Sequence, residues 1–144
     1  MNLFIRNLIF AIVLLISLSV RAQTIQTESY STKGYIKIDG TIQRSNYSTA
    51  GYIRADGMIQ NSSYSTIGYI RKDGTIQNSS YSTLGYVKND GTVQNNSYIT
   101  MGYIKDDGMV QNASYSTLGY AKGVDKEWAA VVFFFFDLLE ETGK

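Results

Sequence analysis

A 17-residue repeat constrains the fold of this chain more than any other feature of its sequence. Gly-Tyr recurs six times at that spacing, and one unit reads Gly-Tyr-Ile-Lys-x-Asp-Gly-Thr-Ile-Gln-Asn-Ser-Ser-Tyr-Ser-Thr-x. A unit this short cannot bury a hydrophobic face alone, so neighbouring units must pack against each other. The Gly-Tyr pairs begin at Gly34, Gly51, Gly68, Gly85, Gly102 and Gly119.

Each Asp-Gly between β-rich flanks predicts a hairpin turn. In the first unit, a two-residue loop would mix apolar and polar groups on both faces. A three-residue loop of Ile38, Asp39 and Gly40, with Gly40 in the left-handed region, pairs Ile36 with Ile42 and puts the aliphatic residues on one face. We predict this second register, with the Asn-Ser-Ser-Tyr segments as links between hairpins. The expected inward pairs are Ile36/Ile42, Ile53/Ile59, Ile70/Ile76, Val87/Val93 and Ile104/Val110, and the Gly-Tyr glycines also face inward.

The repeat region begins and ends on half-units. Thr24–Gln26 matches the second half of a unit, and Gly119–Lys122 matches the first half. If these fragments pair, the sheet closes and has no exposed edge strands. We therefore expect a mainly β fold, a closed ring or shallow barrel of antiparallel hairpins with 10–12 strands; an open solenoid is the alternative.

An apolar segment, Trp128–Leu139, follows the repeats. It is shorter than the about 20 residues that cross a bilayer. A ring of more than about eight strands leaves a space that its own side chains cannot fill. We expect this segment to fill it as a central hydrophobic α-helix from about Lys126 to Glu141; a β-strand is the alternative, because Val and Phe favour strands.

Three residues qualify this expectation. Asp125 is placed to be the N-cap of the helix and Gly143 to mark its end. Asp137 interrupts the apolar run, and we expect it at the mouth of the ring beside a lysine.

The first 22 residues have the pattern of a signal peptide. Arg6 precedes an apolar core, Leu8–Leu18, and Val20-Arg21-Ala22 suits cleavage after Ala22. We expect a secreted or periplasmic protein; an uncleaved membrane anchor is the alternative. The absence of Cys excludes a lipidated N-terminal cysteine. The expected organisation is 1–22 signal peptide, 23–123 hairpin repeats and 124–144 apolar helix, the last two forming one domain.

These features resemble those of the bacterial β-flower proteins. The resemblance rests on tandem Gly-Tyr-(Ile/Val)-(Lys/Arg)-x-Asp-Gly-(Thr/Met)-(Ile/Val)-Gln hairpins, the secretion signal and the apolar C-terminal segment, and covers roughly residues 24–141. It implies five to six hairpin petals in a shallow ring around a hydrophobic helix, an architecture similar to the tubby C-terminal domain. Tubby binds phosphoinositide headgroups, but its binding motif is not matched here, so no site residue is transferred.

The composition argues against catalysis. The chain has no His and no Cys, so the commonest general base and the thiolate nucleophile are missing. The carboxylates recur at turn tips, where Asp suits the geometry, and lack the flanking ligands that Ca²⁺ needs. We expect no enzyme activity, no cofactor and no metal site. With 13 basic and 12 acidic residues, the chain also gives no reason to expect nucleic-acid binding.

The candidate binding surface is a set of cations, each two residues after a tyrosine on the outer face. Cation beside aromatic suits an anionic lipid headgroup or glycan. An ordinary solvated face, with each cation balanced by the turn Asp, is the competing interpretation. The predicted function is a non-enzymatic module that binds an envelope lipid or glycan; the alternative is a structural or interaction protein without a small ligand, whose apolar helix is a core or a membrane or partner element. The surface comprises Lys37, Arg54, Arg71, Lys88, Lys105, Lys122, Tyr35, Tyr52, Tyr69, Tyr86, Tyr103 and Tyr120.

Overall fold

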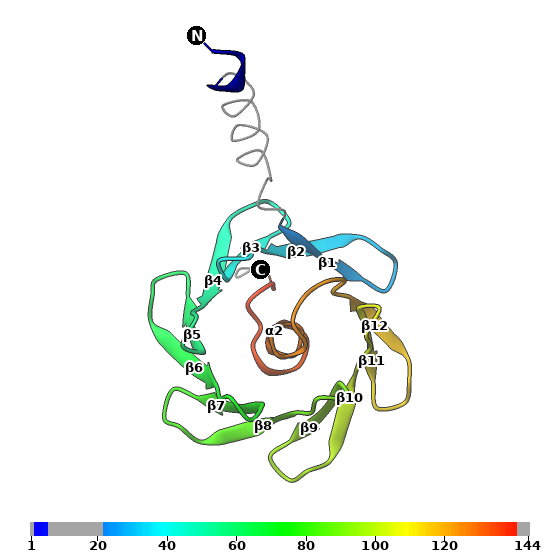
Figure 1. Ribbon diagram of the computed structural model, residues 1–144. Coiled ribbons are helices and arrows are strands. Elements are labelled where there is room, and N and C mark those ends of the chain that lie inside the picture. The colour runs from blue at the N-terminus through cyan, green and yellow to red at the C-terminus, as the bar shows by residue number, and fades with distance from the viewer. Residues whose placement is uncertain (1, 6–21, 141–144) are drawn as a thin grey trace.

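The computed structural model describes residues 2–5 and 22–140. Over the second range, twelve antiparallel strands form one closed barrel in the order β1-β12-β11-β10-β9-β8-β7-β6-β5-β4-β3-β2 (Figure 1). The strands are β1 (Gln23–Thr27), β2 (Thr32–Ile36), β3 (Thr41–Arg44), β4 (Thr49–Ile53), β5 (Met58–Asn61), β6 (Thr66–Ile70), β7 (Thr75–Asn78), β8 (Thr83–Val87), β9 (Thr92–Asn95), β10 (Thr100–Ile104), β11 (Met109–Asn112) and β12 (Thr117–Tyr120).

The predicted closure is confirmed. The two half-units pair as β1 and β12, with Gln26 opposite Tyr120 and Thr27 opposite Gly119. The ring therefore has no free edge, which excludes the open solenoid. Most of the expected signal peptide, residues 6–21, lies outside the described residues, and the expected cleavage point after Ala22 directly precedes β1.

The three-residue Asp-Gly loop is also confirmed. Ile36 lies opposite Ile42 and Tyr35 opposite Gln43. The Gly40 amide donates to the carbonyl of Lys37 at 2.9 Å, and Gly40 has φ +86°. The inward pairs are buried as expected, except that Ile70 is only half-buried. A Cβ at Gly40 would collide with the carbonyl of Ile53 on the next strand, which explains why only Gly fits here.

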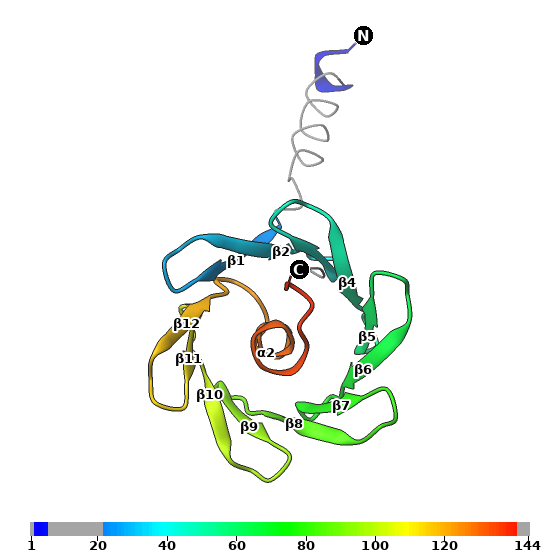
Figure 2. The same ribbon diagram turned by 180° about the vertical axis from the view of Figure 1, so that it is seen from behind.

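The Asn-Ser-Ser-Tyr segments do more than link hairpins. The Tyr64 amide donates to the Asn61 carbonyl and the Asn61 amide to the Ser65 carbonyl, both at 3.0 Å, so this segment is itself a hairpin turn. Figures 1 and 2 show the hairpins that carry these turns splaying outward as petals around the ring. The petals are β1–β2, β3–β4, β5–β6, β7–β8, β9–β10 and β11–β12.

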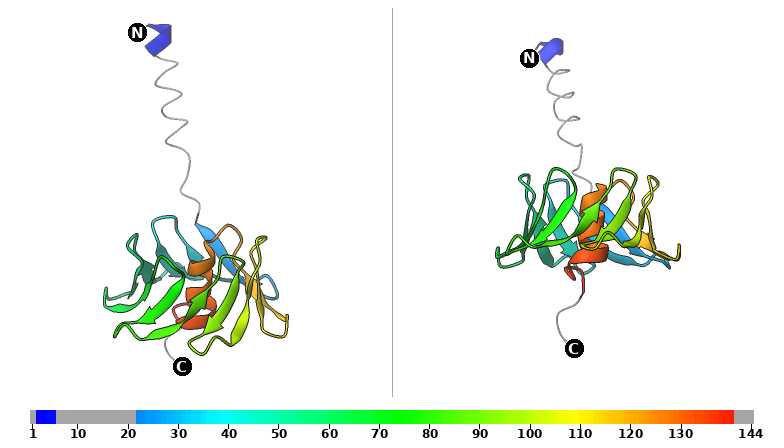
Figure 3. Two further views of the ribbon diagram at one scale, coloured as in Figure 1. Left: turned by 60° about the horizontal axis from the view of Figure 1, so that its bottom comes forward. Right: turned by 90° about the horizontal axis from the view of Figure 1, so that it is seen from below.

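The apolar C-terminal segment runs through the centre of the ring (Figure 3). An α-helix, α2 (Lys126–Ala130), passes into a π-helix, η1 (Val131–Phe135), and Phe136 is already extended with φ −139°. Its helical nature is confirmed, but the expected continuous α-helix from Lys126 to Glu141 is wrong. Asp125 precedes α2 as expected, yet its side chain makes no capping hydrogen bond. The expected helix end near Gly143 lies outside the described residues.

The irregular geometry of this segment follows from the ring around it. Six apolar side chains each face one of the six inward glycines of the Gly-Tyr pairs. An α-helix turns by about 100° per residue, whereas six petals stand about 60° apart, so the chain must unwind to match them. The pairs are Phe133–Gly119, Phe134–Gly102, Phe135–Gly85, Phe136–Gly68, Leu138–Gly51 and Leu139–Gly34.

Asp137 is the one residue in this series that faces no glycine. Asp137 is exposed and lies at the centre of a tight turn. In this turn the Leu138 amide donates to the Phe136 carbonyl at 2.8 Å. The lysine that pairs with an acidic side chain at this end of the segment is Lys33, which lies 2.9 Å from Glu140. Asp137 is thus solvent-facing as expected, without the expected lysine partner. In the part of the chain described, no helix has the length and apolar character to span a membrane.

Candidate functional site: the tyrosine–cation face

The predicted cations lie on the outside of the barrel, each one or two residues after the strand that carries its tyrosine. Lys37 is half-buried and the other five are exposed, while the six strand tyrosines are half-buried. The alternation of the strands produces this placement, because it sends every second side chain outward. The cations recur once per unit, so they surround the barrel and do not gather at one point.

A second set of tyrosines, at the petal tips, completes this surface. Each tip tyrosine stacks on a strand tyrosine with ring centroids 4.5–4.9 Å apart and planes within 11° of parallel. The tip tyrosines are 61–66% exposed, so they present the open ring surface of each stack. The stacks are Tyr30–Tyr120, Tyr35–Tyr47, Tyr52–Tyr64, Tyr69–Tyr81, Tyr86–Tyr98 and Tyr103–Tyr115.

The tip tyrosines are not among the residues predicted from the sequence. Their signal was present, because Tyr recurs every 17 residues at the end of each tip segment. Recurrence alone does not show that these residues adopt φ of +62° to +67°, a region that residues other than Gly seldom enter. Tyr64 therefore occupies in its turn the position that Gly57 occupies in the neighbouring Asp-Gly turn.

Hydrogen bonds hold both the backbone and the ring of the tip tyrosines, as Tyr64 shows. The side-chain amide of Gln60 donates to the Tyr64 carbonyl at 3.0 Å, and the hydroxyl of Tyr52 donates to the Tyr64 hydroxyl at 3.1 Å. The glutamine contact recurs in all six petals. Hydrogen bonding to the partner hydroxyl raises the pKa of Tyr52 above its usual value of 10.0, as it does for the other five strand tyrosines.

Direct cation–aromatic contacts occur at two of the six predicted positions. The Arg54 guanidinium carbon lies 4.7 Å from the Tyr52 ring centroid and 5.8 Å from that of Tyr64. The Lys105 ammonium lies 5.6 Å from the Tyr103 ring centroid. Arg54 also donates to the Gln60 side-chain oxygen at 2.8 Å, which fixes it against the stack.

Open grooves run along this face between successive Asp-Gly turns. One, of about 620 Å³, is lined by Asp73, Tyr86, Lys88, Gln94 and Tyr98 among others. A neighbouring one, of about 460 Å³, is lined by Asp56, Arg71, Lys72 and Asp73 with Ile70. Each groove therefore combines a predicted cation with the carboxylate of the preceding turn.

The turn carboxylates are held in place by their own backbone. Asp73 accepts a hydrogen bond from the Thr75 amide at 3.0 Å, which lowers the pKa of Asp73, and Asp39 and Asp90 repeat this arrangement. These groups therefore remain ionised in any near-neutral medium. Among residues 2–5 and 22–140, no three His, Cys, Asp or Glu side chains come together as a metal cluster would require.

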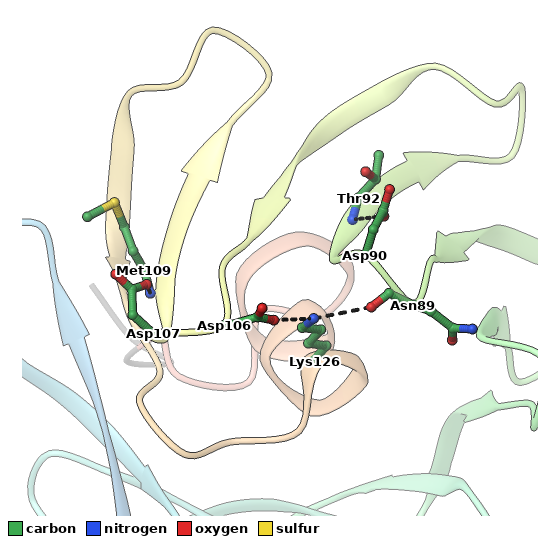
Figure 4. A network of polar contacts seen from close by, with 7 residues as sticks. All are labelled: Asn89, Asp90, Thr92, Asp106, Asp107, Met109 and Lys126. Carbon is green, nitrogen blue, oxygen red and sulfur yellow. Dashed lines mark hydrogen bonds and ion pairs between the residues drawn. The ribbon is translucent and has the colours of Figure 1, made fainter.

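The helix is attached to the ring through two of these turns (Figure 4). The Lys126 ammonium lies 2.7 Å from a carboxylate oxygen of Asp106 and donates to the Asn89 carbonyl at 3.2 Å. The same ammonium lowers the pKa of Asp106. Lys126 thus connects α2 to the Asp-Gly turns and is not part of the tyrosine–cation face.

A family model described as 5-fold beta-flower protein matches residues 22–137. That range includes all twelve strands, α2 and η1. No curated protein and no solved structure matches the chain. The family match and the ring of hairpins around an apolar segment agree, and the chain belongs to the 5-fold beta-flower family.

Proposed function

We propose that this protein is a non-enzymatic module, secreted or periplasmic, that binds an envelope lipid headgroup or glycan on its outer face. The observation that carries the proposal is the repeated unit of a stacked tyrosine pair and an adjacent cation, next to an open groove. A cation supplies attraction for a phosphate or carboxylate, and an exposed aromatic ring supplies apolar contact for a headgroup or sugar. Six copies on one ring favour a ligand that is itself repeated, because linked weak contacts add into avidity.

The test uses the full chain, expressed with its own leader and purified as it accumulates. Binding to lipid vesicles and to isolated cell-wall material is measured by co-sedimentation for the wild type and for a variant with Lys37, Arg54, Arg71, Lys88 and Lys105 changed to Gln. A matched control exchanges Lys and Arg at the same five positions, which keeps the charge. Loss of binding in the Gln variant alone supports the proposal; equal binding by both variants, or none by the wild type, contradicts it.

A structural or interaction role without a small ligand is the second candidate. It is favoured by the match of six apolar side chains to six inward glycines, which gives the C-terminal segment a complete role as core. The version of this role in which the segment leaves the ring for a membrane or a partner is tested by hydrogen exchange. Protection of the amides of residues 129–139 that is unchanged by vesicles contradicts release.

The architecture carries two further proposals. We propose that the ring counts six petals, one more than the family description names, which the pairing of β1 with β12 supports. We also propose that it is related in architecture to the tubby C-terminal domain, on the ground that twelve strands surround a central apolar segment.

A further inference from the structure

Two unlike charges line the groove beside the Tyr86–Tyr98 stack. Lys88 follows β8, and Asp73 comes from the preceding Asp-Gly turn, so the two reach the groove from different parts of the chain. The stacked pair lines the same groove, with centroids 4.7 Å apart and planes within 4° of parallel. The groove therefore offers a cation, an aromatic surface and a carboxylate side by side.

These charges do not neutralise one another. Within residues 22–140, the ion pairs closer than 4.0 Å are Lys33–Glu140 and Lys126–Asp106, so neither Lys88 nor Asp73 has such a partner. The backbone amide of Thr75 holds the Asp73 carboxylate in position, and the Lys88 side chain is exposed. A space separates two opposite charges that a ligand could bridge.

The neighbouring groove repeats the opposite charges, without a tyrosine in its lining and with Lys72 and Asp73 as a second charge of each sign. There Arg71 occupies the position of Lys88 and Asp56 that of Asp73, and again neither takes part in an ion pair within the described residues. The carboxylate would repel a purely anionic ligand, and the Lys or Arg would repel a purely cationic one. Only a ligand with both charges satisfies both walls.

We propose that these grooves bind a zwitterion that carries a phosphate and an ammonium group two carbons apart, as in phosphoethanolamine. The phosphate lies against Lys88, where an ammonium donor suits it, and the ligand's ammonium lies between Asp73 and the edge of the Tyr86–Tyr98 stack. A groove of about 620 Å³ has room for such a group. This proposal rests on the proposed function and specifies the chemistry of its ligand.

The experiment is a titration of the full chain, isotopically labelled and purified as it accumulates, followed by amide chemical shifts. The probes are phosphoethanolamine, phosphoglycerol and ethanolamine. We expect phosphoethanolamine to shift the amides around Asp73 and Lys88 with an affinity about fivefold above that of either single-charge probe, the contribution of one exposed ionic contact. An equal or stronger response to phosphoglycerol overturns the proposal.

Single variants use the other grooves of the same molecule as internal controls. Asp73→Asn keeps an oxygen for the Thr75 amide and removes the charge, so the preference for phosphoethanolamine should disappear at this groove. Because Asp73 also lines the Arg71 groove, the internal control is Asp56→Asn, which should remove the preference at Arg71 and leave it at Lys88. The charge exchange Asp73→Lys with Lys88→Asp should restore the preference with the ligand reversed. A preference that survives Asp73→Asn at this groove contradicts the assignment.

Vesicles distinguish a phosphoethanolamine group carried by a lipid from the free molecule as the ligand. The protein should bind phosphatidylethanolamine vesicles with higher affinity than free phosphoethanolamine, since several grooves act together. Binding to phosphatidylglycerol vesicles with no response to phosphoethanolamine leaves the proposed function standing and overturns the zwitterion. The absence of any response, to probes and vesicles alike, overturns both.

Discussion

Phe134 packs directly against Gly102: a Cβ on this glycine would stand 2.7 Å from the ring. The same relationship joins five other residues of the C-terminal segment to five other glycines, one per petal. The glycine in each Gly-Tyr pair is therefore a socket for one apolar side chain, and the segment contributes one side chain to each petal. The order of residues 133–139 is set by the ring and not by a helical period.

Gly102→Ala should destabilise the barrel. The added methyl group meets both the Phe134 ring and the carbonyl of Gln111, and overpacking of this kind costs about 1–3 kcal/mol. Urea unfolding followed by circular dichroism measures the loss. Ser97→Ala, at an exposed petal tip, is the control and should change the free energy of unfolding by less than about 0.5 kcal/mol. A Gly102→Ala protein as stable as the wild type contradicts the socket interpretation.

Deleting Asp137 should be far more harmful than replacing it. Asp137 stands at the tight turn between Phe136 and Leu138, and its deletion moves both following leucines away from Gly51 and Gly34. Losing the burial of one leucine costs about 2–5 kcal/mol. Asp137→Asn keeps the spacing at an exposed position and should stay within about 0.5 kcal/mol of the wild type. Thermal unfolding of the two variants decides, and equal stabilities contradict the match of one side chain to one petal.

The register and the closure of the ring could be predicted because their causes are local. An Asp-Gly pair with aliphatic residues at the right offsets permits one clean face, and the unmatched half-units mark the strands that must meet. The geometry of the C-terminal segment could not be predicted this way. Its Phe and Leu residues show no helical or strand period, since each side chain packs against the glycine of a different petal.

The candidate site likewise has one part that could be predicted from the sequence and another that could not. The strand tyrosines and cations follow from alternation along a strand, and the structure places them outside. The tip tyrosines could not be predicted as a site, because the repeat does not show that Tyr adopts positive φ here, or that stacking on a strand tyrosine and the glutamine hydrogen bond offset the cost of that backbone. In the Lys88 and Arg71 grooves, a carboxylate from the preceding turn lines the groove with the cation, a relationship that the linear repeat does not display.

The stability of the barrel should fall in strongly alkaline solution. Hydrogen bonding to Tyr47 raises the pKa of Tyr35 above 10.0, and the other strand tyrosines behave alike. A group with a raised folded-state pKa contributes stability that is complete below its unfolded pKa, here 10.0, and is lost as pH rises through the folded value. Ring-labelled tyrosine resonances followed against pH give the pKa values. In Tyr47→Phe, the Tyr35 pKa should move back towards 10.0; an unchanged value contradicts the role of the hydroxyl pair.

Replacing a tip tyrosine should separate its backbone strain from its stacking. Tyr64→Ala loses the stack, worth about 0.5–1.5 kcal/mol, and keeps the cost of positive φ, about 1–2 kcal/mol. Tyr64→Gly loses the same stack but removes the backbone cost, against about 0.5–1 kcal/mol of extra chain entropy. We therefore expect Tyr64→Ala to be less stable than the wild type by about 0.5–1.5 kcal/mol, and less stable than Tyr64→Gly by about 0.5–1 kcal/mol, in urea unfolding. Tyr64→Phe, which keeps the ring, is the matched control and should lose less than Tyr64→Ala. If Tyr64→Gly proves less stable than Tyr64→Ala, the backbone at the tip is not strained by the tyrosine, which contradicts this prediction.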